Sequence, residues 1–141
     1  MRIFNRKARF NYQLEDKFEV GICLTGSEAK SVREKRVDLS NSIGRIIGGE
    51  VYLINANIPT PEARLDPTRS RKLLLHKAEI LSLATKIKQR KLTLVPLSLY
   101  NHGRIFKLEM ALGKSKRKFE KRESLKKKDI KRELEKEFKA G

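Results

Sequence analysis

Cations and planar rings alternate near the start of the chain, a combination suited to binding RNA. The cluster comprises Asn5, Arg6, Lys7, Ala8, Arg9, Phe10 and Tyr12. Lysine and arginine pair with phosphates, and aromatic rings stack on bases that no duplex holds. An N-terminal arm with incidental charge would show the same pattern, so both interpretations stay open for this cluster alone.

A second polar run lies in the middle of the chain. It contains Asp66, Arg69, Arg71 and Lys72. The run can be a phosphate clamp, because guanidinium groups bind phosphate oxygens in pairs, or it can be a solvated loop. Charge runs are more often solvated, and the spacing does not decide between the two.

The string G-x-E-x-K-S begins at Gly26 and includes Glu28, Lys30 and Ser31. It lacks the glycine pair and the spacing of a phosphate-binding loop, so it predicts no nucleotide site. Thr25 precedes Glu28 by the spacing of a capping box, in which each side chain accepts a hydrogen bond from the other residue's backbone N–H. We therefore interpret Glu28 as a structural residue at the start of a helix.

Glu19 is an acid on the free face of a predicted strand in a strongly basic chain. Its carboxylate could accept a hydrogen bond from a base edge or from a 2′-hydroxyl group. Alternatively, it forms an ion pair with Lys17 or with an arginine.

No group of residues has the spacing of a catalytic or metal site. Cys23 is the only cysteine, and it is better interpreted as a small packed residue than as a nucleophile. His76 and His102 are not spaced as metal ligands with Cys23; His76 is predicted to begin a helix. The sequence therefore predicts a protein that is not an enzyme and needs no metal or cofactor.

The charge balance points to a polyanionic partner. The 141 residues include 34 basic and 17 acidic side chains, a formal net charge of +17. Nucleic acid is the first candidate to neutralise this charge, and a membrane surface is the second. No stretch reaches the roughly 18 to 20 continuous apolar residues of a membrane-spanning helix, and no signal peptide is evident. We expect a cytoplasmic protein that binds no membrane and is a monomer when free.

Hydrophobic periodicity predicts short strands and two helices. Residues 18–24 alternate as a strand with one face in the core, and a helix begins after Thr25. Residues 43–47 and 51–54 form a hairpin around Gly48 and Gly49. Prolines make residues 57–71 a long loop.

The rest of the body is predicted as a helix and a second strand pair. Residues 77–89 have the spacing of an amphipathic helix that packs on the sheet. Residues 92–100 and 104–112 are strand-like, with Pro96 at an edge or a bulge. The fold class is mainly β with flanking α-helices: a small OB-like antiparallel β-barrel.

Composition changes at Lys114. Residues 114–141 contain 13 basic and 6 acidic side chains, a net charge of +7. We expect the barrel to occupy residues 1–113 and residues 114–141 to form a basic C-terminal tail, disordered when free and helical when bound on the ribosome.

Several strings occur together in an order that resembles the small protein B family. They are NRKARFNY from Asn5, FEVGICLTGSEAKS from Phe18, DPTRSRKLLLH from Asp66, LTLVPLSLY from Leu92, and Glu120 to Arg122. The resemblance covers nearly the whole chain. It implies an OB-like barrel that binds the tRNA-like domain of transfer-messenger RNA (tmRNA, SsrA) and delivers it to stalled ribosomes for trans-translation, the rescue of ribosomes and tagging of incomplete proteins.

The resemblance also implies which residues contact RNA. In the barrel they are Asn5, Lys7, Tyr12, Glu19, Leu74, His76 and Lys107, to which we add the cations Arg9, Lys30, Arg71 and Lys72. In the tail, which would lie in the decoding centre and the messenger channel, they are Lys116, Arg117, Phe119, Lys121, Arg122, Lys126, Lys127 and Lys128. Glu19 thereby becomes an expected RNA contact.

The chain departs from the family pattern at two positions. Ile43 stands where the family usually has an aromatic residue, and Ser115 stands where it has a hinge glycine. A ribosomal protein that binds structured RNA permanently is the main alternative interpretation, and a nonspecific single-strand binder is the third.

Overall fold

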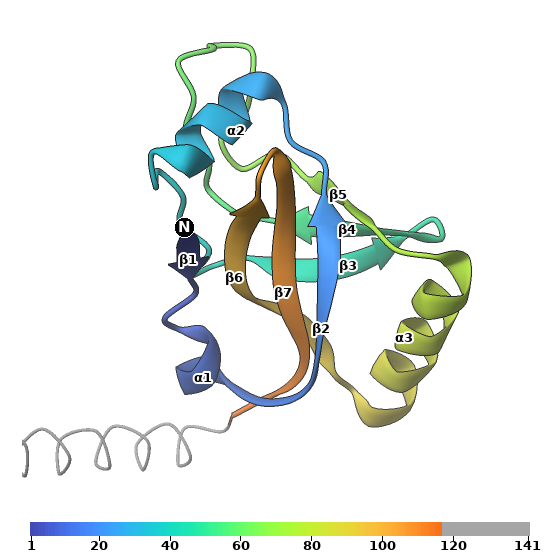
Figure 1. Ribbon diagram of the computed structural model, residues 1–141. Coiled ribbons are helices and arrows are strands. Elements are labelled where there is room, and N and C mark those ends of the chain that lie inside the picture. Colours follow the sequence, from blue (N-terminus) through green and yellow to red (C-terminus); the bar gives the residue numbers. More distant parts are fainter. Residues whose placement is uncertain (117–141) are drawn as a thin grey trace, which may run out of the picture.

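The computed structural model describes residues 1–116, which form a β-barrel flanked by three short or medium helices (Figure 1). The strands are β1 (Arg2–Phe4), β2 (Tyr12–Ile22), β3 (Ile43–Ile47), β4 (Glu50–Ile54), β5 (Arg71–Leu74), β6 (Thr93–His102) and β7 (Ile105–Ser115). The helices are α1 (Ala8–Asn11), α2 (Gly26–Arg33) and α3 (Lys77–Arg90). The predicted class, mainly β with flanking helices, is confirmed.

The sheet closes on itself. All pairings are antiparallel, in the order β1-β6-β3-β4-β5-β2-β7, and β6 also pairs with β7. In Figure 1, β2, β6 and β7 run side by side across the front, and β3 and β4 cross behind them at a steep angle. The β6–β7 pairing closes the ring of strands. The short strand β1 is an additional strand that pairs with β6.

Alternating apolar side chains fill the barrel. Phe106, Leu108 and Met110 of β7 are at most 7% exposed, as are Val20 and Ile22 of β2. These positions point inward because successive side chains of a strand face opposite sides of the sheet. The inward alternation predicted for both strands is confirmed, although β2 begins earlier than predicted, at Tyr12.

The glycine hairpin is also confirmed. β3 and β4 pair in register around Gly48 and Gly49, whose φ angles of 58° and 79° suit a tight two-residue turn. Pro96 lies at a bulge, where the register of β6 against β7 shifts. The bulge alternative therefore holds for Pro96, since β6 is paired on both sides.

The ladder of β7 runs past the expected start of the tail. Ser115 pairs with Tyr12, and the N–H of Lys116 donates to the carbonyl of Asn11 at 2.9 Å. The strand thus ends three residues later than the predicted Leu112, and it crosses the boundary placed at Lys114. The residues that follow lie outside the described part of the chain.

Both predicted helices are present and begin at capping residues. The N–H of Glu28 donates to Thr25 Oγ1 at 3.2 Å, and the N–H of Thr25 donates to Glu28 Oε1 at 3.0 Å, which is the predicted capping box. His76 is the N-cap of α3. Ile80 of α3 is buried in the barrel core, so this helix packs on the sheet as expected.

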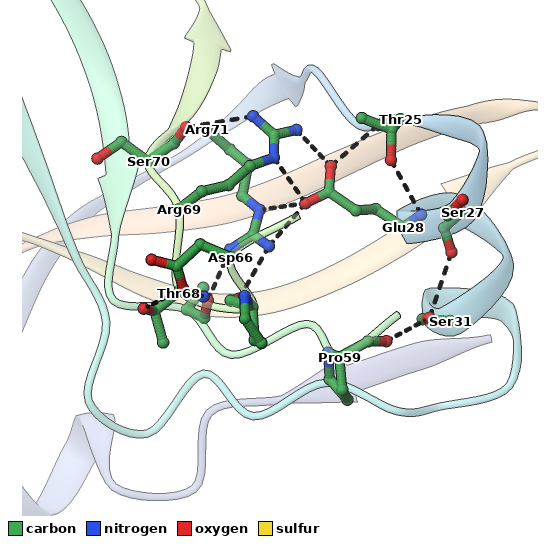
Figure 2. A network of polar contacts seen from close by, with 12 residues as sticks. Thr25, Ser27, Glu28, Ser31, Pro59, Asp66, Thr68, Arg69, Ser70 and Arg71 are labelled. Atoms are coloured by element: carbon green, nitrogen blue, oxygen red, sulfur yellow. Dashed lines mark hydrogen bonds and ion pairs between the residues drawn. The ribbon is translucent and has the colours of Figure 1, made fainter. Parts of the chain in front are cut away.

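Glu28 has a second role that local spacing did not indicate. Its carboxylate accepts hydrogen bonds from Arg71 Nε at 2.8 Å, from Arg71 Nη2 at 2.7 Å and from Arg69 (Figure 2). Arg71 also donates to the carbonyls of Ala56, at 2.6 Å, and Pro67, at 2.9 Å. This buried ion cluster ties α2, the loop after β4 and the start of β5 into one unit.

The cluster replaces both interpretations of the second polar run for Arg71, whereas Asp66 and Lys72 of the same run are exposed. Arg71 is 0% exposed, so it is neither solvated nor able to reach a phosphate on the surface. Asp66 accepts from the N–H and hydroxyl of Thr68 and so closes its own turn. The predicted role of Arg71 as an RNA contact therefore does not hold, because its donors are used inside the protein.

Glu28 remains ionised because its partners outweigh its burial. Burial alone would raise the pKa of the Glu28 carboxyl, but hydrogen bonds from Arg69, the Thr25 N–H and Arg71 lower its pKa below the ordinary 4.5. The stability that Glu28 contributes is fully present above its pKa in the unfolded chain. It is lost as pH falls through the lower pKa of the folded state.

We predict that Glu28→Gln lowers the free energy of unfolding by about 3–5 kcal/mol at pH 7, because it leaves a buried arginine without its counter-charge. The difference between wild type and variant should shrink as pH falls below 4.5, where the carboxyl of the unfolded chain becomes protonated, and it should be lost once pH falls through the lower pKa of the folded state. Urea unfolding from pH 7 downward measures both quantities.

Glu50→Gln is the matched control, since among residues 1–116 Glu50 pairs only with the half-exposed Lys72, at 3.6 Å. Its effect should stay within about 0.5 kcal/mol. A loss for Glu28→Gln that is equally small, or that does not change with pH, would contradict the role assigned to the cluster.

Candidate nucleic-acid interface

Strand register places five residues in one row across the outside of the barrel. Arg2 of β1 pairs with Tyr100 of β6, and Tyr100 pairs with Lys107 of β7. Lys107 pairs with Gly21 of β2, and Gly21 pairs with Leu74 of β5. The row brings Lys107 and Leu74, which are far apart in sequence, onto one surface.

A second row runs beside the first. Phe4 pairs with Ser98, Ser98 with Glu109, and Glu109 with Glu19. We call the two rows together the outer face. It therefore contains three of the predicted RNA-binding residues, Glu19, Leu74 and Lys107, on three neighbouring strands.

Glu19 lies in a polar network on the outer face. Lys107 Nζ is 2.8 Å from Glu19 Oε1, and the hydroxyl of Tyr100 donates to Glu19 Oε2. The side chains of Glu19 and Lys107 keep 44% and 35% of their surface exposed. The ion-pair alternative is thus correct in kind, but the partner is Lys107 rather than Lys17 or an arginine.

Leu74 is an apolar patch beside this network. It is 54% exposed, and a Cβ atom added at Gly21 would come within 3.1 Å of its Cδ1 atom. Gly21 therefore leaves room for Leu74 to lie close over β2. An exposed leucine next to a lysine can contact a base or ribose while the lysine binds a phosphate.

Lys72 and His76 extend the outer face along β5. Both line a hollow with Leu74 and Glu50, and the His76 side chain is 94% exposed. Lys72 is half-exposed and 3.6 Å from Glu50. These side chains continue the surface to the first turn of α3.

A second group of predicted residues gathers around α1. Asn5, Lys7 and Tyr12 line one hollow with a loop that includes Ser40, and Ile43 lies in the same hollow. The departure from the family pattern at Ile43 therefore falls in the group that contains Tyr12, so that Tyr12 is the ring available for stacking there. We call this hollow the α1 site.

Asn5 holds the α1 site in place. Its Nδ2 donates to the carbonyl of Pro96 at 2.8 Å, and its backbone N–H donates to the carbonyl of Leu97 at 2.8 Å. The residue is buried. Asn5 thus attaches α1, which carries Arg9, to the bulge of β6.

Arg9 connects the α1 site with the outer face. It lines a hollow that also contains Phe4, Ser98 and Glu109. Phe4 is strongly exposed on β1, so a ring and a cation lie together between the two groups. The surface is therefore continuous from α1 across the barrel to β5.

The remaining predicted residues are elsewhere. Lys30 is exposed on α2, in a hollow shared with Arg36 and Pro59 that is separate from the outer face. Lys116 follows the end of β7. The tail residues Arg117, Phe119, Lys121, Arg122, Lys126, Lys127 and Lys128 lie outside the described residues.

Sequence reasoning missed part of the outer face and misplaced one residue. Arg2, Tyr100 and Glu109 were not selected, although the alternation of β6 and β7 could have indicated which side chains face outward. Cys23 was expected to be packed, but it is exposed just after β2. Within residues 1–116, no three His, Cys, Asp or Glu side chains are grouped to hold a metal ion.

The closed barrel, its partly apolar outer face and the cations around that face define an RNA-binding protein of the OB-like class. A family model described as SmpB protein matches residues 2–140. The chain belongs to the SmpB family. Within the described residues, no helix has the length and apolar character to cross a membrane.

Relatives and a solved structure agree with this assignment. The chain is 50% identical over 139 residues to an SsrA-binding protein of Sulfurihydrogenibium sp., covering 96% of this chain and 91% of the relative. It is 47% identical to an SsrA-binding protein of Halothermothrix orenii, covering 96% and 90%. A structure described as "tmRNA-SmpB: a journey to the center of the bacterial ribosome" matches with a TM-score of 0.70 and 40% identity, covering 88% of this chain and 94% of that chain.

We predict that Asn5→Ala lowers the free energy of unfolding by about 1–3 kcal/mol, because it leaves a buried carbonyl without its donor. Asn41→Ala, at an exposed position on the rim of the same hollow, should stay within about 0.5 kcal/mol. Urea unfolding compares the two, and equal stability of both variants would contradict the anchoring role of Asn5.

Proposed function

We propose that this protein binds the tRNA-like domain of tmRNA and delivers it to stalled ribosomes for trans-translation. The observation that carries the proposal is the register that gathers Glu19, Leu74 and Lys107 on one face of the barrel. Membership of the SmpB family and the names of the relatives, SsrA-binding proteins, support the same RNA partner.

Charge contributes affinity for RNA, and hydrogen bonding contributes selectivity for one RNA fold. The net charge of +17 attracts any RNA through its phosphates, by a term that weakens as salt rises. Glu19 repels phosphates, so it contributes only where an RNA fold presents a base N–H or a 2′-hydroxyl group to it. The outer face therefore favours one folded RNA over others, while the cations around it supply affinity.

We assign the α1 site to the same RNA surface. Lys7 and Arg9 would bind phosphates, and Tyr12 would stack on a base. The continuous path from α1 to β5 supports a single extended contact with a folded RNA. Lys30 on α2 would contact a different RNA segment or the ribosome.

The basic tail would act on the ribosome rather than on tmRNA. Its net charge of +7 suits a channel lined by ribosomal RNA, and an occupied messenger channel would exclude it. Translating ribosomes would thus be distinguished from stalled ones by occlusion. We further propose that the protein acts in the cytoplasm, as a monomer before it meets RNA, and that it catalyses no reaction.

The first test measures binding of the full chain to a tRNA-like RNA and to an unstructured RNA of equal length at about physiological salt. We expect preference for the folded RNA, and Glu19→Ala should weaken that binding about 10- to 100-fold through the loss of a charge-assisted hydrogen bond. The unstructured RNA should bind the variant no more weakly than it binds wild type, because the change removes a negative charge.

Glu34→Ala is the matched control. Glu34 has the same side-chain exposure as Glu19, 44%, and it pairs with Arg36 at the C-terminal end of α2, outside the two rows of the outer face. It should leave both affinities near wild type. Equal binding of the two RNAs by wild type would contradict the proposed rescue factor and would indicate a polycation that binds RNA nonspecifically.

The second test separates the barrel from the tail. A chain that ends at Lys116 keeps the whole β7 ladder, so it should fold and bind the tRNA-like RNA within about threefold of wild type. It should fail to support tagging on ribosomes stalled at the end of a truncated message. Retained tagging would refute the role proposed for the tail, and lost RNA binding would refute the role proposed for the barrel.

A further inference from the structure

We propose that Tyr100 is a positioning residue that fixes the Glu19 carboxylate for RNA. This inference rests on the proposed function and concerns how the outer face achieves it. Tyr100 is 5% exposed, so it lies beneath the surface that RNA would touch. Its hydroxyl group donates to Glu19 Oε2, whereas Glu19 itself is exposed.

The carboxylate of Glu19 is held at both oxygens. Tyr100 binds Oε2, and Lys107 Nζ lies 2.8 Å from Oε1. An ionised carboxylate has about four acceptor positions, so two donors leave room for an RNA group at each oxygen. Glu19 would then meet RNA in one orientation, and little side-chain entropy would be lost on binding.

Such a support is needed because Glu19 stands directly opposite Glu109 across the β2–β7 ladder. Like charges at opposite positions of two strands repel each other. Arg2 Nη1 lies 3.0 Å from Glu109 Oε2 and so neutralises one of the two acids. Lys107 neutralises the other, and the Tyr100 hydroxyl directs it.

Tyr100 is itself clamped from the N-terminal strand. The guanidinium carbon of Arg2 lies 4.0 Å from the centre of the Tyr100 ring, and Arg2 also donates to Ser98 Oγ at 3.0 Å. The rings of His102 and Tyr100 also pack in a T-shaped arrangement, with 5.6 Å between the ring centres. The hydroxyl is thus supported by a ring that has little freedom to move.

Tyr100→Phe is the informative change, because it keeps the ring, its packing and the arginine stack but removes the hydroxyl. We expect binding to the tRNA-like RNA to weaken about 3- to 10-fold, as for the loss of one hydrogen bond. Binding to the unstructured RNA should not change. The melting temperature of each variant shows that the fold persists.

A double-mutant cycle shows whether Tyr100 acts through Glu19. In a Glu19→Ala background, Tyr100→Phe should have no further effect on binding. Tyr52→Phe, on β4 and away from Glu19, is the control and should leave the affinity of each background unchanged.

The outcomes separate this inference from the function on which it rests. If Glu19→Ala does not weaken binding, the proposed contact at Glu19 fails and the positioning role fails with it. If Glu19→Ala weakens binding but Tyr100→Phe does not, or weakens it equally with and without Glu19, the RNA contact stands and the positioning role of Tyr100 is refuted.

Discussion

The two ladders that meet on β7 are the constraint on which this structure depends. β7 pairs with β2 on one side and with β6 on the other, along nearly its whole length. Its inward side chains form the barrel core, and its outward residues Lys107 and Glu109 form the middle of the outer face. Because a slip of one residue would exchange these two sets, core packing and surface recognition are secured by the same register.

Both neighbours of β7 bulge opposite the same stretch of it. The register of β2 shifts between Glu15 and Lys17, and that of β6 shifts between Pro96 and Ser98. Asp16, in the first bulge, has a φ angle of 48°, a conformation that aspartate tolerates better than most residues. Bulges bend and twist strands, so this pair helps to curl the sheet into a closed barrel.

Much of the fold was predictable because its signals are local. Alternation in Phe106, Leu108 and Met110, the glycine turn and the capping box each depend on residues a few positions apart. The bulge at Asp16 was not predictable, since one aspartate among charged residues gives no such signal. β1 and β5 are stabilised by pairing rather than by their own short sequences, and neither stands out in the periodicity.

The candidate site was predictable only as far as its members could be selected one by one. Glu19 and its partner Lys107 are 88 residues apart, and Arg71 and its partner Glu28 are 43 apart. Which charges meet is decided by tertiary structure, so an arginine in a polar run can be fully buried. The resemblance selected Glu19, Leu74 and Lys107, but only the register places them on one surface.

The ion cluster of Glu28, Arg69 and Arg71 changes what the recognisable strings of this sequence mean. The strings around Glu28 and Arg71 are the most distinctive part of the family resemblance, and their charged side chains meet inside the protein, away from the outer face. These strings therefore identify the fold rather than the RNA that it binds. A search that relied on them would recover chains with this scaffold even if the RNA surface had diverged, whereas residues such as Glu19 and Tyr100 would report whether the binding specificity had been retained.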